Sequence, residues 1–424
     1  MVGNRSKQMA NIKLYLLLFL FLFNIKLRFI PIFTSNIIIA LLGAVIALMN
    51  FGSQNFRFEK SVYIHIKIFC LLIFFSLASL IINKTTDLSF IKLFVVNNTV
   101  LLLAAYYISY FYYKNNISFV DFLKIFVYVY FVQMIIVCFF FFNRELANIV
   151  YSSIIDMGDR LNKKLEDLLE YRAFGISFGF DMGTADLTIA LFFCVYLYLT
   201  QEKQYKRWLI IYLFCCVFGL LVARTMFLGI GISILFYLFF PCKIKYRKMR
   251  ALISLSFYIG IAIIIFALFF DIKKYMRTIM WITDIFVQFA SKKGLSSGSL
   301  YELTKGDMVF YPGTKTMLFG DGLYDINCVY RYTDVGYLRL LIYFGLYGTI
   351  TYCLFIFSRA NLLFFVKKSK QVLILTFFIL IFQFIFLWKI YYQITSIPLL
   401  LMLGIYPTLR KTNAINRNDN LQRI

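Results

Sequence analysis

Apolar runs close to twenty residues long recur along the whole sequence, and they restrict the folds open to this chain more than any other feature. Hydrophobic residues account for 62% of its 424 residues and charged residues for only 15%. Because about twenty apolar residues in a helix cross the hydrocarbon core of a bilayer, we predict an all-α, polytopic membrane protein with one membrane domain over 1–424. About twelve spans are expected, at 13–23, 36–50, 61–82, 91–112, 120–142, 183–200, 208–223, 226–240, 251–270, 335–358, 371–388 and 393–408.

The basic residues are unevenly distributed between the two sides of the predicted membrane domain. With a cytoplasmic N-terminus, the inside segments are 1–13, 51–60, 113–119, 201–207, 241–250, 359–370 and the C-terminal tail. They hold 22 Lys and Arg residues against 3 acidic residues, whereas the outside segments hold 18 basic and 15 acidic residues. This bias follows the positive-inside rule. The formal net charge of +24 is therefore an orientation signal that places both termini in the cytoplasm. Membrane lipids are the expected partners of these segments, and nucleic acid is not.

Two outside segments are longer than a connection between spans requires. The first, 143–182, contains "ANIVYSSIIDMGDRLNKKLEDLLEY", where apolar residues recur at helical spacing. It predicts an amphipathic helix on the membrane surface. The second, 271–334, begins with a further amphipathic stretch, "KKYMRTIMWITDIFVQFA". Loops of this length usually carry function, because a bare connection needs only a few residues.

The cysteines and the single histidine suggest no disulfide or metal site. Only Cys328 lies in an outside loop, Cys242 lies on the inner side, and the other cysteines fall within predicted spans. The outer loops therefore cannot hold a disulfide, and no CxxC spacing indicates zinc. His65 opens the third span, where a structural role is favoured, and one histidine cannot form a multi-histidine site. No metal and no cofactor are expected.

Arg224 is the only charged residue in the apolar run from Trp208 to Phe240. Arg207 marks the inner end of this run, and the intervening helix is about 26 Å long, so Arg224 lies near the outer edge of the membrane. An arginine costs at least about 2.5 kcal/mol near the bilayer centre and less toward its edge. One interpretation is that Arg224 snorkels to the interface. The other is that it binds a phosphate or a carboxylate, for which the guanidinium fork is suited.

A second arginine precedes the sixth span, in "YRAFGISFGFDMGTADLTIA". Arg172 is followed by three glycines at intervals of four, which suit tight turns or close helix packing equally. Asp181 and Asp186 are expected at the rim of the span. Acidic residues at a helix start complement the helix macrodipole, so both have a structural interpretation beside a functional one.

The stretch "FGDGLYDINCVYRYTDVGY" is polar for so apolar a chain. Gly320 and Gly322 predict a turn, and Arg331, Asp334 and Arg339 follow around the start of the tenth span. Asp334 is either an N-cap of this helix or a general base that takes a proton from a sugar hydroxyl. In the second case the turn holds its carboxylate over a basic, outward-facing cavity.

Three stretches resemble the polytopic O-antigen polymerases and the related O-antigen ligases. They are Arg172-x-x-Gly175 leading into the sixth span, "LLVARTMFLGIG" around Arg224, and "LFGDGLYD" continuing to "DVGYLRLLIYFGLYG". The order of these stretches, the span count and the long outside loop extend the resemblance over nearly the whole chain. The ligase branch has a histidine near the position of Asp334, and its absence here favours a polymerase. A family arginine near "SLYEL" is also missing, and Arg277, Lys305 or Arg331 can substitute for it.

The resemblance implies a GT-C-like membrane glycosyltransferase of the bacterial inner membrane, with a periplasmic active site. Its donor and acceptor are undecaprenyl-diphosphate-linked glycans, and transfer is inverting and independent of metal. A chain-length regulator protein is a further partner that the resemblance suggests. The expected catalytic residues are Arg172, Arg224 and Asp334. The expected substrate-binding residues are Arg339, Arg331, Arg277, Lys305, Asp181, Asp186 and Tyr337.

Other protein classes also fit part of the pattern. A flippase or exporter of lipid-linked oligosaccharide would have a similar number of spans and internal basic residues, but shorter loops on both sides. An O-antigen ligase shares the family motifs. A chain-length or scaffold protein would have fewer spans and a larger soluble domain. The length of the loop at 271–334 favours the polymerase over a flippase or exporter. The missing histidine disfavours the ligase, and the number of predicted spans disfavours a chain-length or scaffold protein.

Overall fold

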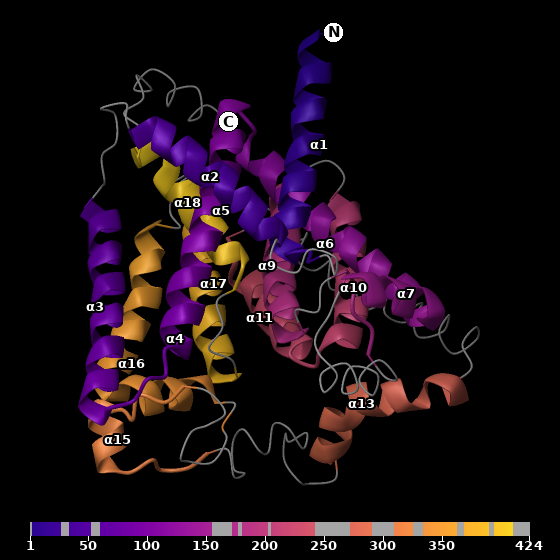
Figure 1. Ribbon diagram of the computed structural model, residues 1–424. Coiled ribbons are helices and arrows are strands. Elements are labelled where there is room, and N and C mark those ends of the chain that lie inside the picture. Colours follow the sequence, from indigo (N-terminus) through magenta and orange to yellow (C-terminus); the bar gives the residue numbers. More distant parts are fainter. Residues whose placement is uncertain are drawn as a thin grey trace. The chain divides into compact units, whose positions relative to one another are not determined.

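The computed structural model describes residues 2–26, 34–51, 60–154, 172–176, 180–201, 205–241, 272–290, 309–324, 333, 335–362, 369–389 and 394–409 (Figure 1). Within these ranges the chain is helical, and the only β pairing is an isolated bridge between Lys26 and Thr34. The predicted all-α fold is therefore confirmed for the part of the chain that is described.

Seven of the described helical segments are long and apolar enough to cross a membrane. They are Lys60–Asn83, Ser89–Lys114, Phe119–Phe142, Gly183–Thr200, Tyr205–Val222, Gly336–Arg359 and Lys370–Trp388. Shorter apolar helices cover Ser35–Asn50, Met226–Phe239 and Ser396–Pro407. The protein is thus a membrane-embedded helical protein. Each predicted span coincides with a described helix except 251–270, which lies outside the described residues, so the full count of twelve stays a prediction.

The described chain separates into two compact units. Unit 1 comprises 1–35 and 117–301, and unit 2 comprises 36–116 and 302–424. The helices of unit 1 are α1 (Val2–Phe23), α6 (Phe119–Phe142), α7 (Arg144–Ile154), α9 (Phe180–Thr200), α10 (Tyr205–Val222), α11 (Met226–Phe239) and α13 (Ile272–Ala290). Those of unit 2 are α2 (Ser35–Phe51), α3 (Lys60–Asn83), α4 (Ser89–Ile91), η1 (Lys92–Val96), α5 (Asn97–Lys114), α15 (Thr314–Phe319), α16 (Gly336–Leu362), α17 (Lys370–Lys389) and α18 (Ser396–Leu409).

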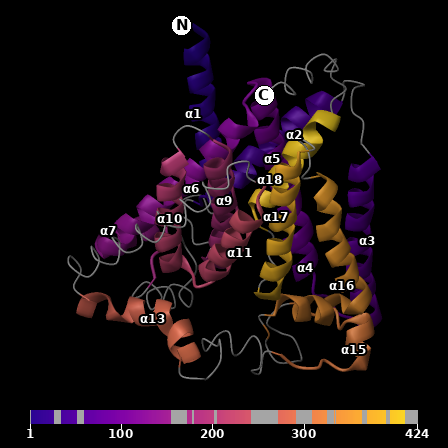
Figure 2. The same ribbon diagram turned by 180° about the vertical axis from the view of Figure 1, so that it is seen from behind.

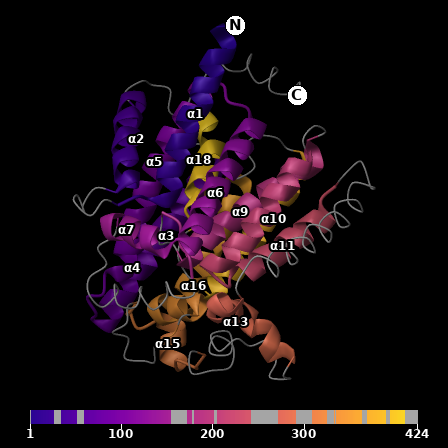
Figure 3. The same ribbon diagram turned by 90° about the vertical axis from the view of Figure 1, so that its right-hand side faces the viewer.

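Helix α9 forms the centre of unit 1. It packs against α6, α10 and α11, which run beside it (Figures 1 and 3). Its side chains from Thr184 to Leu199 are buried on every face, as expected for a helix without a polar stripe. Gly229 lets α11 approach closely, because a Cβ there would lie 2.1 Å from the hydroxyl oxygen of Thr188. Glycine at this position thus fixes the spacing of two central helices.

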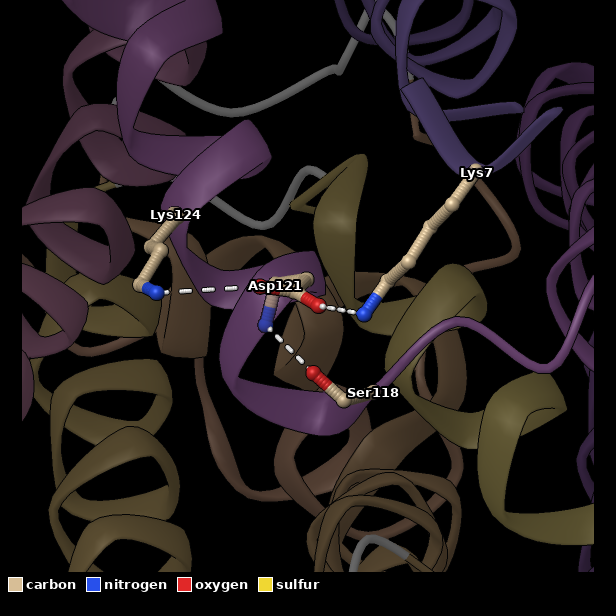
Figure 4. Close-up of polar contacts among 4 residues, drawn as sticks. All are labelled: Lys7, Ser118, Asp121 and Lys124. Atoms are coloured by element: carbon tan, nitrogen blue, oxygen red, sulfur yellow. Dashed lines mark hydrogen bonds and ion pairs between the residues drawn. The ribbon is translucent and has the colours of Figure 1, made fainter. Parts of the chain in front are cut away.

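Helix α1 begins well before the predicted span, and an ion pair ties its polar first part to α6. Ser118 caps α6 by accepting a hydrogen bond from the backbone N–H of Asp121 at 3.1 Å. The Asp121 carboxylate pairs with Lys7 at 3.4 Å and with Lys124 at 3.6 Å (Figure 4). The charged N-terminal segment is therefore part of a continuous helix rather than a loop before the span.

In unit 2, α16 packs against α3 and α17, and α5 packs against α18, as the two opposite views also show (Figures 1 and 2). Helix α16 is not straight. Gly345 has φ 71° and ψ −168°, which interrupts the helix. The sequence predicted an unbroken span here, and only the tertiary structure reveals this kink.

The kink in α16 explains the glycine-rich turn at 320–322. The backbone N–H groups of Asp321 and Gly322 donate to the carbonyls of Ile342 and Tyr343, at 2.6 and 3.3 Å. These carbonyls precede Gly345, where an unbroken helix would have bonded them within itself. Gly320 and Gly322 have positive φ values of 72° and 64°, which confirms the predicted turn.

The same turn is attached to the end of α3. Asn83 donates a side-chain hydrogen bond to the Gly320 carbonyl at 3.0 Å, and Thr85 donates one to the Gly322 carbonyl, also at 3.0 Å. Asp87 accepts from the backbone N–H of Tyr324 at 2.6 Å. Polar side chains at the end of α3 therefore bind the backbone of the turn, and the turn itself bonds to the kinked part of α16.

Candidate functional site

Arg172 and Arg224, far apart in the sequence, meet at one aromatic side chain in unit 1. The Arg172 guanidinium carbon lies 4.5 Å from the centre of the Trp281 ring, and that of Arg224 lies 5.4 Å from it. Each contact is a cation–π interaction worth roughly 0.5–2 kcal/mol, depending on exposure. The two charges are thus at most about 10 Å apart, and at an effective dielectric constant near 20 they repel by at least about 2 kcal/mol.

An acidic residue from the same helix as Trp281 offsets part of this repulsion. Asp284 accepts a hydrogen bond from Nη1 of Arg224 at 2.9 Å, and the two side chains are 32% and 19% exposed. Trp281 and Asp284 stand three residues apart on α13 and so share one face of it. Two positive charges, of Arg172 and Arg224, and the negative charge of Asp284 thus lie around Trp281, and guanidinium groups are suited to anionic ligands.

Arg224 is held by a tight turn between α10 and α11. The backbone N–H of Met226 donates to the Ala223 carbonyl at 3.1 Å, and that of Phe227 donates to the Arg224 carbonyl at 3.0 Å. The hydroxyls of Thr225 and Thr184 form a hydrogen bond of 2.9 Å, which ties the turn to α9. Arg224 therefore projects from a fixed turn toward α13, and its ion pair with Asp284 is not the contact expected of an arginine that only snorkels to lipid.

Arg172 is held through its main chain. Nη1 of Arg144 donates to the Arg172 carbonyl at 2.6 Å, and the next residue, Ala173, donates its N–H to the Leu221 carbonyl at 3.2 Å. Tyr151 of α7 donates its hydroxyl to the Phe174 carbonyl. Burial raises the pKa of the Tyr151 phenol, so this donor stays neutral at physiological pH. The segment that carries Arg172 is thus connected to α7 and α10.

Gly175 completes this attachment by allowing contact with α6. A Cβ at Gly175 would lie 1.9 Å from the side-chain nitrogen of Gln133. The side-chain oxygen of Gln133 accepts from the backbone N–H of Ile176 at 3.3 Å. Of the two roles that the glycine pattern left open, Gly175 serves close packing. Nothing lies within 4 Å of a Cβ at Gly183, and Gly179 lies outside the described residues.

Other predicted residues of unit 1 occupy different positions. Arg277 is exposed on α13, and it precedes Trp281 by four residues and Asp284 by seven, so it lies on the same helix face. Asp186 is only 2% exposed and lies in the interior of the unit rather than at its rim. Asp181 is in the first turn of α9, and its side chain lies outside the described part.

The predicted residues of unit 2 are partly described. The Nε of Arg339 donates to the Thr333 carbonyl, which holds the arginine at the start of α16. The Tyr337 hydroxyl donates to the Phe384 carbonyl of α17 at 2.8 Å, so it joins two helices. Asp334, Arg331 and Lys305 lie outside the described residues, and their predicted roles stay predictions.

Sequence reasoning missed Trp281 and Asp284. Both lie in the stretch "KKYMRTIMWITDIFVQFA", which was interpreted only as amphipathic, and the predicted helix is present as α13. The spacing of Arg277, Trp281 and Asp284 places an aromatic and two charged residues on one face of this helix. That pattern is visible in the sequence, but nothing in it indicates that the face meets Arg172 and Arg224.

Two further findings bear on the chemistry. Among the described residues no group of three or more His, Cys, Asp or Glu side chains could hold a metal ion. Comparisons of the chain with protein-family models, curated proteins and solved structures found no significant match. The functional interpretation therefore depends on the three sequence stretches and on the arginine cluster itself.

Proposed function

We propose that this protein is a membrane glycosyltransferase that polymerises oligosaccharide repeat units linked to undecaprenyl diphosphate, as O-antigen polymerases do. The observation that carries the proposal is the convergence of Arg172 and Arg224 on Trp281. Both arginines belong to stretches that resemble this family. A diphosphate is the kind of ligand that two adjacent guanidinium groups bind through paired hydrogen bonds.

The proposed reaction transfers the growing glycan to a new repeat unit. A hydroxyl oxygen of the acceptor sugar attacks the anomeric carbon of the donor, and the bond from this carbon to the phosphate oxygen breaks with inversion. The electron pair of that bond leaves with undecaprenyl diphosphate. Arg172 and Arg224 stabilise the negative charge that develops on this leaving group, which is how fixed cations accelerate such transfers. The hydroxyl proton passes to a general base, for which we propose Asp334.

The proposed setting is the bacterial inner membrane, with both termini cytoplasmic and the transfer on the periplasmic side. The bias of Lys and Arg toward one set of short loops supports this orientation. A chain-length regulator protein is a further proposed partner. The apolar helices provide a surface compatible with polyprenyl chains, as any membrane-spanning helix would.

The proposal is tested by chain growth from purified lipid-linked repeat units in detergent. We expect Arg172→Lys and Arg224→Lys each to slow polymer formation by roughly 10²-fold, because lysine has no planar fork of donors. Arg207→Lys is the matched control. Arg207 also stacks on an aromatic ring, that of Tyr128 at 4.8 Å, but it lies at the opposite end of α10 from Arg224. This control should retain wild-type activity.

The same assay separates the alternatives. A flippase or exporter yields no chain growth in detergent, and an O-antigen ligase transfers a glycan only when a lipopolysaccharide core acceptor is added. Asp334→Asn tests the base: loss of chain growth by roughly 10²–10⁴-fold with retained donor binding supports it. Near-normal rates with Asn would assign Asp334 to helix capping, since Asn caps about as well as Asp.

A further inference from the structure

Unit 2 contains a buried cation with no anionic partner among the residues that the structure describes. Arg359, near the end of α16, is only 6% exposed. Its Nε is fully buried and has no hydrogen-bond partner. The guanidinium carbon lies 4.3 Å from the centre of the Phe355 ring, one turn earlier in the helix. A buried charge without a hydrogen-bonded partner is costly, and a single aromatic ring compensates for only part of that cost.

No described helix of unit 2 that reaches this region supplies an acidic residue. The helices α2, α3, α5, α16, α17 and α18 contain no Asp or Glu at all. The described acidic residues of the unit are Asp87 and Asp321, which lie at the other end of α3. That end is about 27 Å away along the helix. Within the part of unit 2 that the structure describes, Arg359 therefore has no anionic partner.

His65 of α3 adds a second polar group beside Arg359. Its ring stacks on Phe355 at 4.6 Å and 19°, and its Nδ1 is hydrogen-bonded to the Ser358 hydroxyl. This hydroxyl donates its only hydrogen to the Phe355 carbonyl at 2.8 Å. Ser358 must then accept the bond from His65, so Nδ1 carries the hydrogen in the neutral imidazole. The remaining nitrogen, Nε2, makes no hydrogen bond to any described residue.

The positions of Arg359 and His65 along their helices indicate which anion could reach them. Arg359 is the last residue of the apolar segment Gly336–Arg359, and His65 lies in the second turn of Lys60–Asn83. Both positions are near an end of a membrane-spanning helix, where lipid phosphates lie. The exposed residues Lys60 and Lys67 stand on the same part of α3 and increase the local positive potential.

We propose that Arg359, beside the stacked ring of His65, forms a binding site for a phosphate group, with a membrane phospholipid or free phosphate as the source. Arg359 supplies the charge and a fork of donors that matches phosphate oxygens. Ser358 and Phe355 hold the imidazole in place beside it. The site belongs to unit 2, whereas Arg172 and Arg224 belong to unit 1, so it does not depend on the proposed transferase activity.

The test measures thermal unfolding of the full-length protein after its lipids have been removed in a neutral detergent. Phosphatidylglycerol, phosphatidylcholine, diacylglycerol and inorganic phosphate are each titrated. A ligand that binds only the folded state raises the unfolding midpoint, by an amount that grows with the logarithm of one plus the ratio of ligand concentration to Kd. We expect both phospholipids to stabilise the protein and diacylglycerol to have no comparable effect. Equal stabilisation by diacylglycerol would overturn the proposal. Stabilisation by inorganic phosphate alone identifies free phosphate as the source.

Two variants connect the effect to the site. Arg359→Met should weaken the apparent affinity for phospholipid at least tenfold while leaving the lipid-free protein at least as stable as wild type, because it removes an uncompensated buried charge. Arg207→Met is the control, since Arg207 has the same kind of aromatic contact but is exposed. An unchanged affinity in Arg359→Met would refute the site. If that variant does not fold, Arg359→Lys keeps the charge but not the planar fork of donors and should weaken the affinity several-fold; no change there would equally refute the site.

Discussion

At the scale of single residues, the arginine cluster of unit 1 depends on α13 for its charge balance. Trp281 contacts both arginines, and Asp284 pairs with Arg224. A carboxylate lies 2.9 Å from Arg224, where it would compete with a phosphate oxygen of the substrate that we propose. The ion pair is partly exposed, so its own contribution to folding stability is about 0–1 kcal/mol. We therefore expect Asp284 to affect the binding of the proposed substrate more than it affects folding stability.

This balance predicts the effect of Asp284→Asn. Removing the competing carboxylate should lower the donor KM by up to about fivefold, the equivalent of about 1 kcal/mol, with little change in thermal stability. The measurement is initial rate against donor concentration in the purified system. Asp121→Asn is a suitable control, because Asp121 is also a partly exposed, ion-paired acid of unit 1.

Two other outcomes would change the role assigned to Asp284. A higher KM would indicate that Asp284 positions Arg224 rather than competing with the substrate. A large loss of kcat with unchanged KM would make Asp284, instead of Asp334, the general base.

At the scale of elements, α13 and α16 show two ways in which a helix departs from its simple sequence pattern. On α13, Met276, Met280 and Val287 fall in one stripe and are exposed, whereas Trp281 and Asp284 face the arginines. The helix thus presents an apolar face and a functional face. In α16 the positive φ of Gly345 interrupts an otherwise apolar helix, and the carbonyls before it accept hydrogen bonds from N–H groups of the turn at 320–322.

The kink predicts that Gly345→Ala is strongly destabilising. A Cβ at Gly345 would lie 2.3 Å from the Leu318 carbonyl oxygen, and alanine disfavours φ 71°. We expect a loss of more than about 2 kcal/mol, seen as a lower unfolding temperature in detergent. Gly231→Ala is the control, because nothing lies within 4 Å of a Cβ there. In a helix this change should be neutral or stabilise by up to about 1 kcal/mol. Equal effects of the two substitutions would contradict the kink.

At the scale of the whole molecule, orientation in the membrane decides which chemistry the arginine cluster can perform. The distribution of Lys and Arg predicts that the segment 271–334 is periplasmic. The same segment contributes Trp281 and Asp284 to the cluster. A test of the orientation of this segment is therefore also a test of the proposed periplasmic reaction.

Cys328 provides the measurement of this orientation. A membrane-impermeant maleimide added to intact spheroplasts should label the wild-type protein and not Cys328→Ser. The other cysteines contribute little background, because those at 194, 215 and 216 are buried and the rest lie in predicted spans or on the inner side. Labelling that requires access to the cytoplasmic side would reverse the orientation and exclude periplasmic transfer.

The sequence by itself determined the helical membrane class, the positions of most spans, the turn at Gly320 and Gly322, and the position of Arg224 as a lone charge in an apolar run. These follow from local pattern, because membrane helices satisfy their backbone hydrogen bonds within themselves and need a continuous apolar run. Only the tertiary structure decided which residues meet. The contact of Trp281 with both arginines and the pairing of Asp284 with Arg224 join segments that are distant in sequence, and the kink at Gly345 and the burial of Arg359 were likewise seen only in the folded chain. Such contacts depend on how helices pack, and helix packing is set by side chains from several elements at once rather than by the periodicity of any one.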